Sequence, residues 1–235
     1  MHAILSAFAT ADPFGKAIFI ALFALSILCW SLLIYKVWLI REVEKMRGSA
    51  FHLARNVTDA VLTIAPTAFR TSKRRDVPAP FRTIYETLQL KTKELLDKNH
   101  YFEQRYLTQP DIELIDAHVG ATIASSRSSV ERHFFLLSMT ATLAPFLGLL
   151  GTVWGILLTF SGLQSGASFS SNAAILGGLS TALTTTVLGL VIAIPALISY
   201  SYLQNASKRL SEEMDQFRHI LLSTVELQYR RPDGK

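Results

Sequence analysis

Hydroxyl side chains are the main candidates for polar chemistry in the most apolar part of this chain, which has no acidic or basic residue. Residues 134–207, 74 positions, contain no Asp, Glu, Lys, Arg or His. The candidate hydroxyls in this segment belong to Thr152, Thr159, Thr181, Thr185 and Thr186. A threonine hydroxyl can donate to or accept from a polar group supplied by another chain. It needs a titratable neighbour before it can take part in acid–base chemistry, so we expect hydrogen bonding and not proton abstraction.

Small residues accompany these hydroxyls at helical spacing and form two faces. Positions 141, 145, 148, 152, 155 and 159 read Ala, Pro, Gly, Thr, Gly and Thr, and positions 178, 182, 186, 189 and 193 read Gly, Ala, Thr, Gly and Ala. In lipid, small residues allow two helix backbones to approach closely. We therefore assign helix packing to Gly148, Gly155, Gly178, Gly189, Pro145 and Pro195. The threonines have two open interpretations, lining of a cavity or bonding to their own helix carbonyls.

Enzyme chemistry, a cofactor and a metal are not expected. An intramembrane protease would need a base, a carboxylate pair or a metal set within its spans, and none lies in 134–207. The six histidines are scattered, and Cys29, the one cysteine, lies in an apolar run. The net charge of +5 comes from basic residues interleaved with acidic ones. This pattern favours a membrane orientation signal over nucleic-acid binding.

Three membrane spans must position these residues. The charge-free segment is long enough for two helices of about 20 apolar residues each, with a break at 161–172, which is rich in Gly and Ser. A further apolar run, residues 17–35, could be a signal peptide, but Asp12 precedes it and Trp30 and Trp38 mark its far end. An uncleaved first helix is the better interpretation. The fold class is therefore an all-α integral membrane protein with three transmembrane helices.

Basic residues give the orientation of these spans. Of 23 Lys and Arg, one (Lys16) precedes the first helix and none lies in the 161–172 turn. The positive-inside rule places the N-terminus and the turn in the periplasm, and the long loop and the C-terminal tail in the cytoplasm. The expected segments are a periplasmic N-terminus (1–16), helix 1 (17–40), a cytoplasmic helical loop (41–132), helix 2 (133–160), a periplasmic turn (161–172), helix 3 (173–207) and a cytoplasmic helical tail (208–235).

The second and third membrane helices are predicted to extend into a cytoplasmic helical bundle. Thr108–Asp111 has the sequence of a helix start, and one helix is expected from about Pro110 to Phe160. Residues 81–107 predict a further amphipathic helix. The tail carries an apolar stripe, whose partner we expect to be the extension of helix 2 or a neighbouring subunit; its members are Leu210, Met214, Phe217, Leu221 and Val225.

Two motifs carry a resemblance to a known family. They are APFLGLLGTVWGI (residues 144–156) and LSTALTTTVLGLVIAIP (residues 179–195). This pattern resembles the MotA/TolQ/ExbB proton channel family, most closely TolQ and ExbB. The resemblance implies a homopentamer in the bacterial inner membrane whose second and third helices surround the single-span helices of a TolR/ExbD-type partner. The partner's membrane Asp would carry the proton, and a TolA/TonB-type protein would be a further partner.

The resemblance also implies roles for individual residues. Thr152 and Thr186 match the family's second-helix and third-helix threonines. Thr181 stands where many TolQ and ExbB sequences have Glu, so any role of that Glu in proton relay is missing or moved. The expected function is a pore-forming stator subunit that couples the proton-motive force to envelope work. A TolQ-like version comes first because the region before helix 1 is short, and an ExbB-like version follows. A non-conducting pentameric scaffold is the alternative, and a four-span MotA-type stator fits less well.

Overall fold

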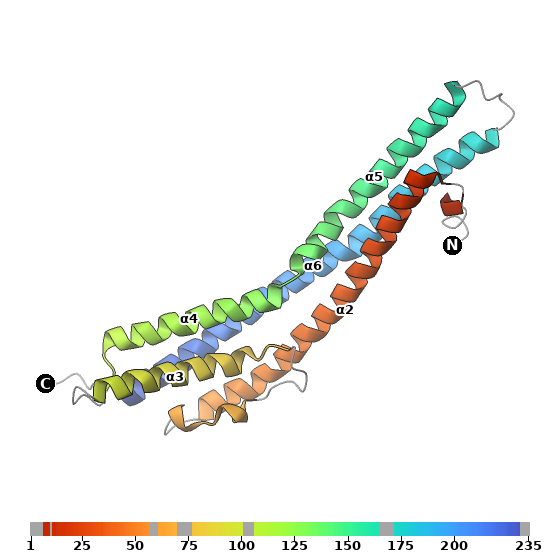
Figure 1. Cartoon of the computed structure of the whole chain (residues 1–235). Helices are drawn as coiled ribbons and strands as arrows, with labels where there is room; N and C mark the ends of the chain where they lie inside the picture. The colour runs from red at the N-terminus through yellow and green to blue at the C-terminus, as the bar shows by residue number, and fades with distance from the viewer. Residues whose placement is uncertain are drawn as a thin grey trace. The chain divides into compact units, whose positions relative to one another are not determined.

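The chain folds into helices throughout its described part. The computed structural model describes residues 7–9, 11–56, 61–69, 77–100, 106–164 and 172–230. Within these ranges the only β pairing is an isolated bridge between Leu107 and Arg230. The long helices in Figure 1 are α2 (Pro13–Asn56), α3 (Pro80–His100), α4 (Gln109–Glu131), α5 (Phe134–Gln164) and α6 (Asn172–Tyr229), and two short 3₁₀ turns, η1 (Val61–Thr63) and η2 (Pro66–Ala68), follow α2.

Three of the described helical stretches are long and apolar enough to cross a membrane, which confirms the predicted all-α membrane class. They lie within Pro13–Arg55, Gln109–Gly162 and Leu176–Tyr229. Large apolar side chains on them face outward instead of into the protein; Ile27 is 71% exposed and Phe160 is 64% exposed. Apolar surface of this extent requires a non-aqueous environment or a partner, and lipid supplies the former.

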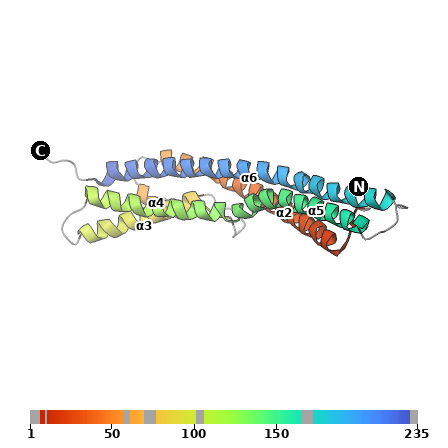
Figure 2. The ribbon, with the colours of Figure 1, turned by 90° about the horizontal axis from the view of Figure 1, so that it is seen from above.

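The chain divides into two compact units. The hairpin unit consists of Met1–Tyr35 and His133–Leu203, and the bundle unit consists of Lys36–Arg132 and Gln204–Lys235. In the hairpin unit, α5 lies alongside the first half of α6 (Figures 1 and 2). Ile18 and Leu22 of α2 pack there in a cluster with Ala144 of α5 and Ile192 of α6. This packing gives the three apolar helices a common core.

The predicted continuous helix from Pro110 to Phe160 is interrupted, and this prediction was wrong. Arg132 leaves the helical region with ψ at 130°, and His133 has a φ of 74°, a left-handed conformation that few residues other than glycine adopt. The α4 helix therefore ends at Glu131, and α5 starts at Phe134. Buried Lys36 donates from Nζ to the Val130 carbonyl at 2.9 Å, which satisfies one of the last carbonyls of α4.

The end of α5 also differs from expectation. The helix continues to Gln164, past the predicted limit at Phe160. Residues 165–171, most of the predicted periplasmic turn, lie outside the described residues.

An aromatic cluster in the bundle unit includes one residue of the tail stripe, Phe217. Phe217 of α6 is fully buried, and its ring centroid lies 5.6 Å from that of Phe51 on α2 and 5.4 Å from that of Phe81 on α3. All five predicted stripe residues are buried. Phe217 therefore packs on α2 and α3 of the same chain, two contacts that we had not predicted. Nearby, burial raises the pKa of Tyr85 to about 12, and its hydroxyl lies 2.7 Å from the Val61 carbonyl.

The predicted start of the helix after Thr108 is confirmed. Thr108 donates to Asp111 Oδ2 through its backbone N–H at 2.9 Å and through its hydroxyl at 2.7 Å. Asn99 of α3 donates to the same oxygen at 2.9 Å. Burial would raise the pKa of Asp111, but these hydrogen bonds outweigh it and hold the pKa below its ordinary value. The carboxylate therefore joins the ends of α3 and α4.

Candidate ion pathway in the membrane hairpin

Glycines on α5 bring it into close contact with α6. A β-carbon built at Gly148 would lie 2.9 Å from Thr186 Cα, and one built at Gly155 would lie 2.7 Å from Ala182 Cβ. Real carbon atoms do not approach this closely, because dispersion contacts are optimal near 3.5–4.0 Å. A larger side chain at either position would push the two helices apart.

Glycines on α6 make the same kind of contact in the reverse direction. A β-carbon at Gly178 would lie 2.7 Å from Thr159 Oγ1, and one at Gly189 would lie 2.5 Å from the Ala144 carbonyl oxygen. The four glycines to which the sequence assigned helix packing therefore lie on the surfaces where α5 and α6 meet.

Two of the candidate hydroxyls, on α6, form hydrogen bonds to α5 across this helix contact. Thr185 is 2% exposed, and its Oγ1 donates to the Ala182 carbonyl at 2.6 Å or the Gly148 carbonyl at 3.2 Å. Thr186 Oγ1 donates to the same Gly148 carbonyl at 3.0 Å. The proton of the Thr186 hydroxyl is therefore used within the hairpin. Its oxygen lone pairs remain able to accept a bond.

The other three candidate hydroxyls bond to their own helices. Their acceptors are the carbonyls of Leu149 at 2.7 Å for Thr152, Gly155 at 2.8 Å for Thr159 and Gly177 at 2.8 Å for Thr181. A hydrogen bond to a carbonyl of the same helix gives the hydroxyl proton an acceptor in lipid, so no acceptor from another helix is required. The Thr152 hydroxyl lies at the protein surface and, among the described residues, makes no bond across the hairpin. Of the two threonines matched to the family motif, Thr152 therefore has the more accessible hydroxyl.

Each helix of the hairpin also carries a proline. Pro145 lies within α5 and Pro195 within α6. A proline inside a helix lacks the N–H that would bond four residues back. The Ser199 hydroxyl donates to the Pro195 carbonyl at 2.5 Å. Proline and serine therefore alter the regular backbone hydrogen bonding in this part of α6.

A carboxylate from the N-terminal segment, that of Asp12, contacts the hairpin, a contact that the sequence did not predict. The two oxygens of Asp12 accept the Phe14 and Gly15 N–H groups at 3.2 and 3.1 Å, which caps α2. Trp154 of α5 donates its indole N–H to Asp12 Oδ2 at 3.0 Å, and its ring lies 4.5 Å from that of Phe14. The Asp-Pro sequence at residues 12–13 is a recognisable helix start. The contact with Trp154 has no such local signal.

A family model for the MotA/TolQ/ExbB proton channel family matches residues 83–216, more than half of the chain. The chain belongs to this family. The matched range includes all of α5 and most of α6, the helices that carry the threonines and glycines described above.

Curated relatives in this family extend the match along most of the chain. A biopolymer transport protein ExbB of Neisseria meningitidis is 28% identical over 221 residues, which are 91% of this chain and 93% of the relative. The ExbB of Neisseria gonorrhoeae has the same identity and coverage. The ExbB of Xanthomonas campestris is 31% identical over 110 residues, 46% of this chain and 43% of the relative. With three apolar helices, this family member is a multi-pass membrane protein.

The Asp12 contact gives a pH-dependent stability prediction for this family member. Burial would raise the pKa of Asp12, but the hydrogen bonds from Trp154, Gly15 and Phe14 outweigh it and lower the pKa below 3.8. A lowered folded-state pKa contributes stability above about pH 4 that is lost as the pH falls through that lowered value. We expect Asp12→Ala to destabilise the protein by about 1 kcal/mol, the usual worth of a helix cap, and to remove this acid-side loss.

Thermal unfolding in detergent between pH 3 and pH 7 measures both effects. Asp12→Asn is the matched control, because asparagine caps helices equally well and its amide oxygen can accept the Trp154 N–H. It should unfold near the wild-type temperature at neutral pH and lack the acid-side transition. If Asp12→Ala unfolds at the wild-type temperature throughout, the carboxylate does not anchor α2.

Proposed function

We propose that this chain is the pore-forming stator subunit of an inner-membrane proton channel that couples the proton-motive force to work in the cell envelope. The observation that carries the proposal is a segment of 74 residues (134–207) that forms the hairpin and has hydroxyls but no Asp, Glu, Lys, Arg or His. Such a hairpin can form the wall of a proton pathway but cannot carry the proton. The carrier is a membrane Asp on a single-span partner of the TolR/ExbD type.

The energetics of a membrane carboxylate support this division of labour. A carboxyl group in the bilayer is costly when it is ionised and has no hydrogen-bond donor. Protonation or a hydrogen bond lowers this cost. The Thr152 hydroxyl lies at the surface and can turn from the Leu149 carbonyl to donate to the carboxylate. The Thr186 hydroxyl donates to the Gly148 carbonyl, and its lone pairs can accept from the protonated, neutral carboxyl group. An elementary charge crossing 100 mV releases about 2.3 kcal/mol. The subunit therefore lowers the energetic cost of placing the partner's carboxylate in the bilayer, and the membrane potential drives proton movement.

The assembly and its orientation belong to the same proposal. The chain forms a pentamer around the partner helices, with Thr152, Thr159, Thr181 and Thr186 along the pathway and Thr185 buried behind them in the contact between α5 and α6. Its N-terminus is periplasmic and its C-terminus is cytoplasmic, as the distribution of Lys and Arg indicates. Thr181 occupies the position of the family Glu, so the partner's Asp is the one carboxylate of the pathway within the membrane.

The envelope process is the finer part of the proposal. The ExbB names of the relatives support TonB-type energisation of outer-membrane uptake, and a Tol–Pal-type role is the alternative that the family resemblance leaves open. Deletion of the gene tests the function and separates the two versions. Loss of TonB-type uptake with an intact outer-membrane barrier would favour the first version, and barrier defects with normal uptake would favour the second. A deletion with neither defect would contradict energisation of the envelope.

A non-conducting scaffold is the second candidate, and one observation favours it. All five candidate threonine hydroxyls already donate to helix carbonyls. These five hydroxyl donors therefore need no ligand as a hydrogen-bond acceptor. A scaffold would hold a single-span partner that has no membrane carboxylate. Sequencing the partner gene for a membrane Asp, followed by flux measurements, distinguishes the two functions.

A further inference from the structure

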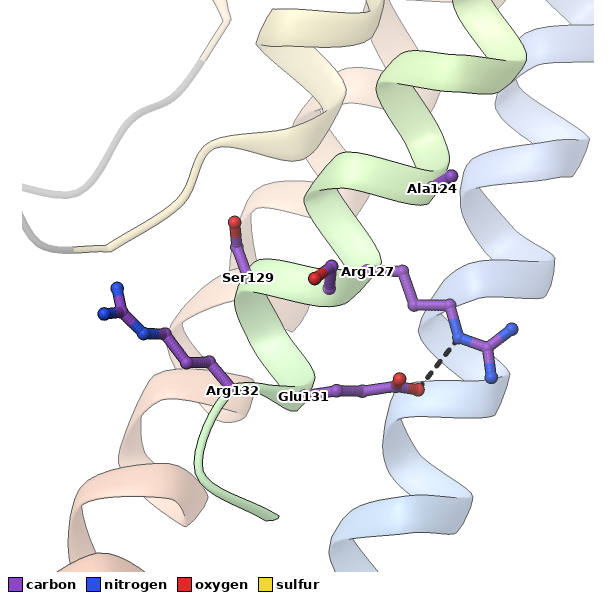
Figure 3. A pocket seen from close by; sticks show the side chains of 6 residues that line it. Ala124, Arg127, Ser129, Glu131 and Arg132 are labelled. Carbon is purple, nitrogen blue, oxygen red and sulfur yellow. Dashed lines mark hydrogen bonds and ion pairs between the residues drawn. The ribbon is translucent and has the colours of Figure 1, made fainter. Parts of the chain in front are cut away.

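A surface pocket lies at the last turn of α4, outside the proposed ion pathway. Its volume is about 640 Å³, and the side chains around it come from a single helix end; they belong to Ala124, Arg127, Ser128, Ser129, Glu131 and Arg132. Figure 3 shows Ser129 and Arg132 extending on one side of the helix and Arg127 and Glu131 on the other. The pocket therefore has two polar sides that differ in charge.

The Arg132 side consists of donors that have no acceptor. Arg132, Ser128 and Ser129 are exposed, and among the described residues their side chains make no hydrogen bond or ion pair. The pocket's one carboxylate, on Glu131, is already used, since its Oε1 accepts from Arg127 Nε at 2.8 Å and from the Ser207 hydroxyl at 3.1 Å. An arginine and hydroxyls without acceptors are suited to bind an anion.

Two further observations indicate which anion this is. Arg132 lies two residues before Phe134, where the apolar helix α5 begins, so it lies at the depth where membrane headgroups meet water. Its charge also acts on Lys36, a second cation, which is buried and bonded to the end of α4. A bound anion would offset this repulsion. The anion that every phospholipid presents at this depth is its phosphate group.

We propose that Arg132 and Ser129 bind the phosphate group of a membrane phospholipid. The guanidinium donates two parallel N–H bonds to phosphate oxygens, and the Ser129 hydroxyl, three residues back on the same side of the helix, donates a third. The lipid thereby fixes the non-helical connection between α4 and α5 at the membrane surface. The proposal is independent of proton conduction.

Lipid titration of the full-length protein in detergent, read by native mass spectrometry, tests this site. We expect Arg132→Gln to weaken phosphatidylglycerol binding about tenfold, as loss of one bidentate charge-assisted contact implies. Arg132→Lys should retain part of the affinity, and Ser129→Ala should show a smaller loss. Arg55→Gln is the matched control. Arg55 is also exposed and makes no side-chain bond among the described residues, and its substitution removes the same charge.

The outcomes separate a site from general surface charge and a lipid from a soluble phosphate. Equal losses in Arg132→Gln and Arg55→Gln, or no loss in Arg132→Gln and Ser129→Ala, would overturn the site. Binding that resists millimolar inorganic phosphate supports a lipid ligand. Displacement of the lipid by inorganic phosphate would overturn it in favour of a soluble phosphate. Circular dichroism of each variant verifies that the helices are retained.

Discussion

Thr152→Val is expected to lower proton flux through the assembled channel by about tenfold or more while leaving membrane insertion intact. The Thr152 hydroxyl bonds to Leu149 of its own helix and makes no bond to α6, so valine, which has nearly the same shape, removes no hairpin contact. A hydrogen bond to a charged group is worth about 1.5–3 kcal/mol, which corresponds to a flux lower by about 10- to 100-fold. The measurement is proton flux in liposomes that contain the chain and its single-span partner.

A second threonine of α5 provides the control for this substitution. Thr142 is exposed and bonds back to the Ser138 carbonyl at 3.0 Å, but it lies outside the proposed pathway, so Thr142→Val should leave flux unchanged. Thr186→Val should also lower flux strongly, and it should lower stability because the bond to Gly148 is lost. Full flux in both Thr152→Val and Thr186→Val would mean that these hydroxyls serve packing alone.

Gly148→Leu is expected to prevent α5 and α6 from packing. The β-carbon would lie 2.9 Å from both the Thr185 carbonyl oxygen and Thr186 Cα, and backbone atoms cannot move aside as the end of a flexible side chain can. We expect a loss of about 3 kcal/mol, at the upper end for overpacked sites, together with loss of the assembled oligomer. The measurements are the thermal unfolding temperature in detergent and the oligomer fraction in size-exclusion chromatography.

Gly177→Leu is the matched control for overpacking. Gly177 lies on α6, and a β-carbon there would meet nothing within 4 Å, so the added side chain should extend freely. This variant should unfold close to the wild-type temperature. If Gly148→Leu assembles as well as Gly177→Leu, the close contact between α5 and α6 is not required.

The membrane helices could be predicted because their signal is local and strong. A charge-free run of 74 residues has few alternatives to membrane helices. The break between α4 and α5 could not be predicted in this way, because Arg132 and His133 are not helix breakers by type. The break is accompanied by a contact between residues 94 positions apart, the bond from Lys36 to Val130. Local propensity cannot report such a bond.

The same distinction applies to the candidate site. Small residues at helical spacing indicated which face of each helix packs, and Gly148 and Gly155 lie at that contact. The direction of each hydroxyl depends on the partner helix, so the sequence could not tell that Thr186 bonds across the hairpin whereas Thr152 does not. Asp12 and Trp154 are 142 residues apart, and only the fold brings them together.

Proton flux in liposomes that contain this chain and its single-span partner tests the central claim most directly. The comparison is between the wild-type partner and a variant whose membrane Asp is replaced by Asn, with complex assembly verified for both. We expect an imposed membrane potential to drive proton flux through the wild-type complex, and we expect this flux to disappear in the Asp→Asn variant. Flux that persists without the Asp, or no flux from an assembled wild-type complex, would contradict a proton pathway whose wall is this hairpin and whose carrier is the partner's carboxylate.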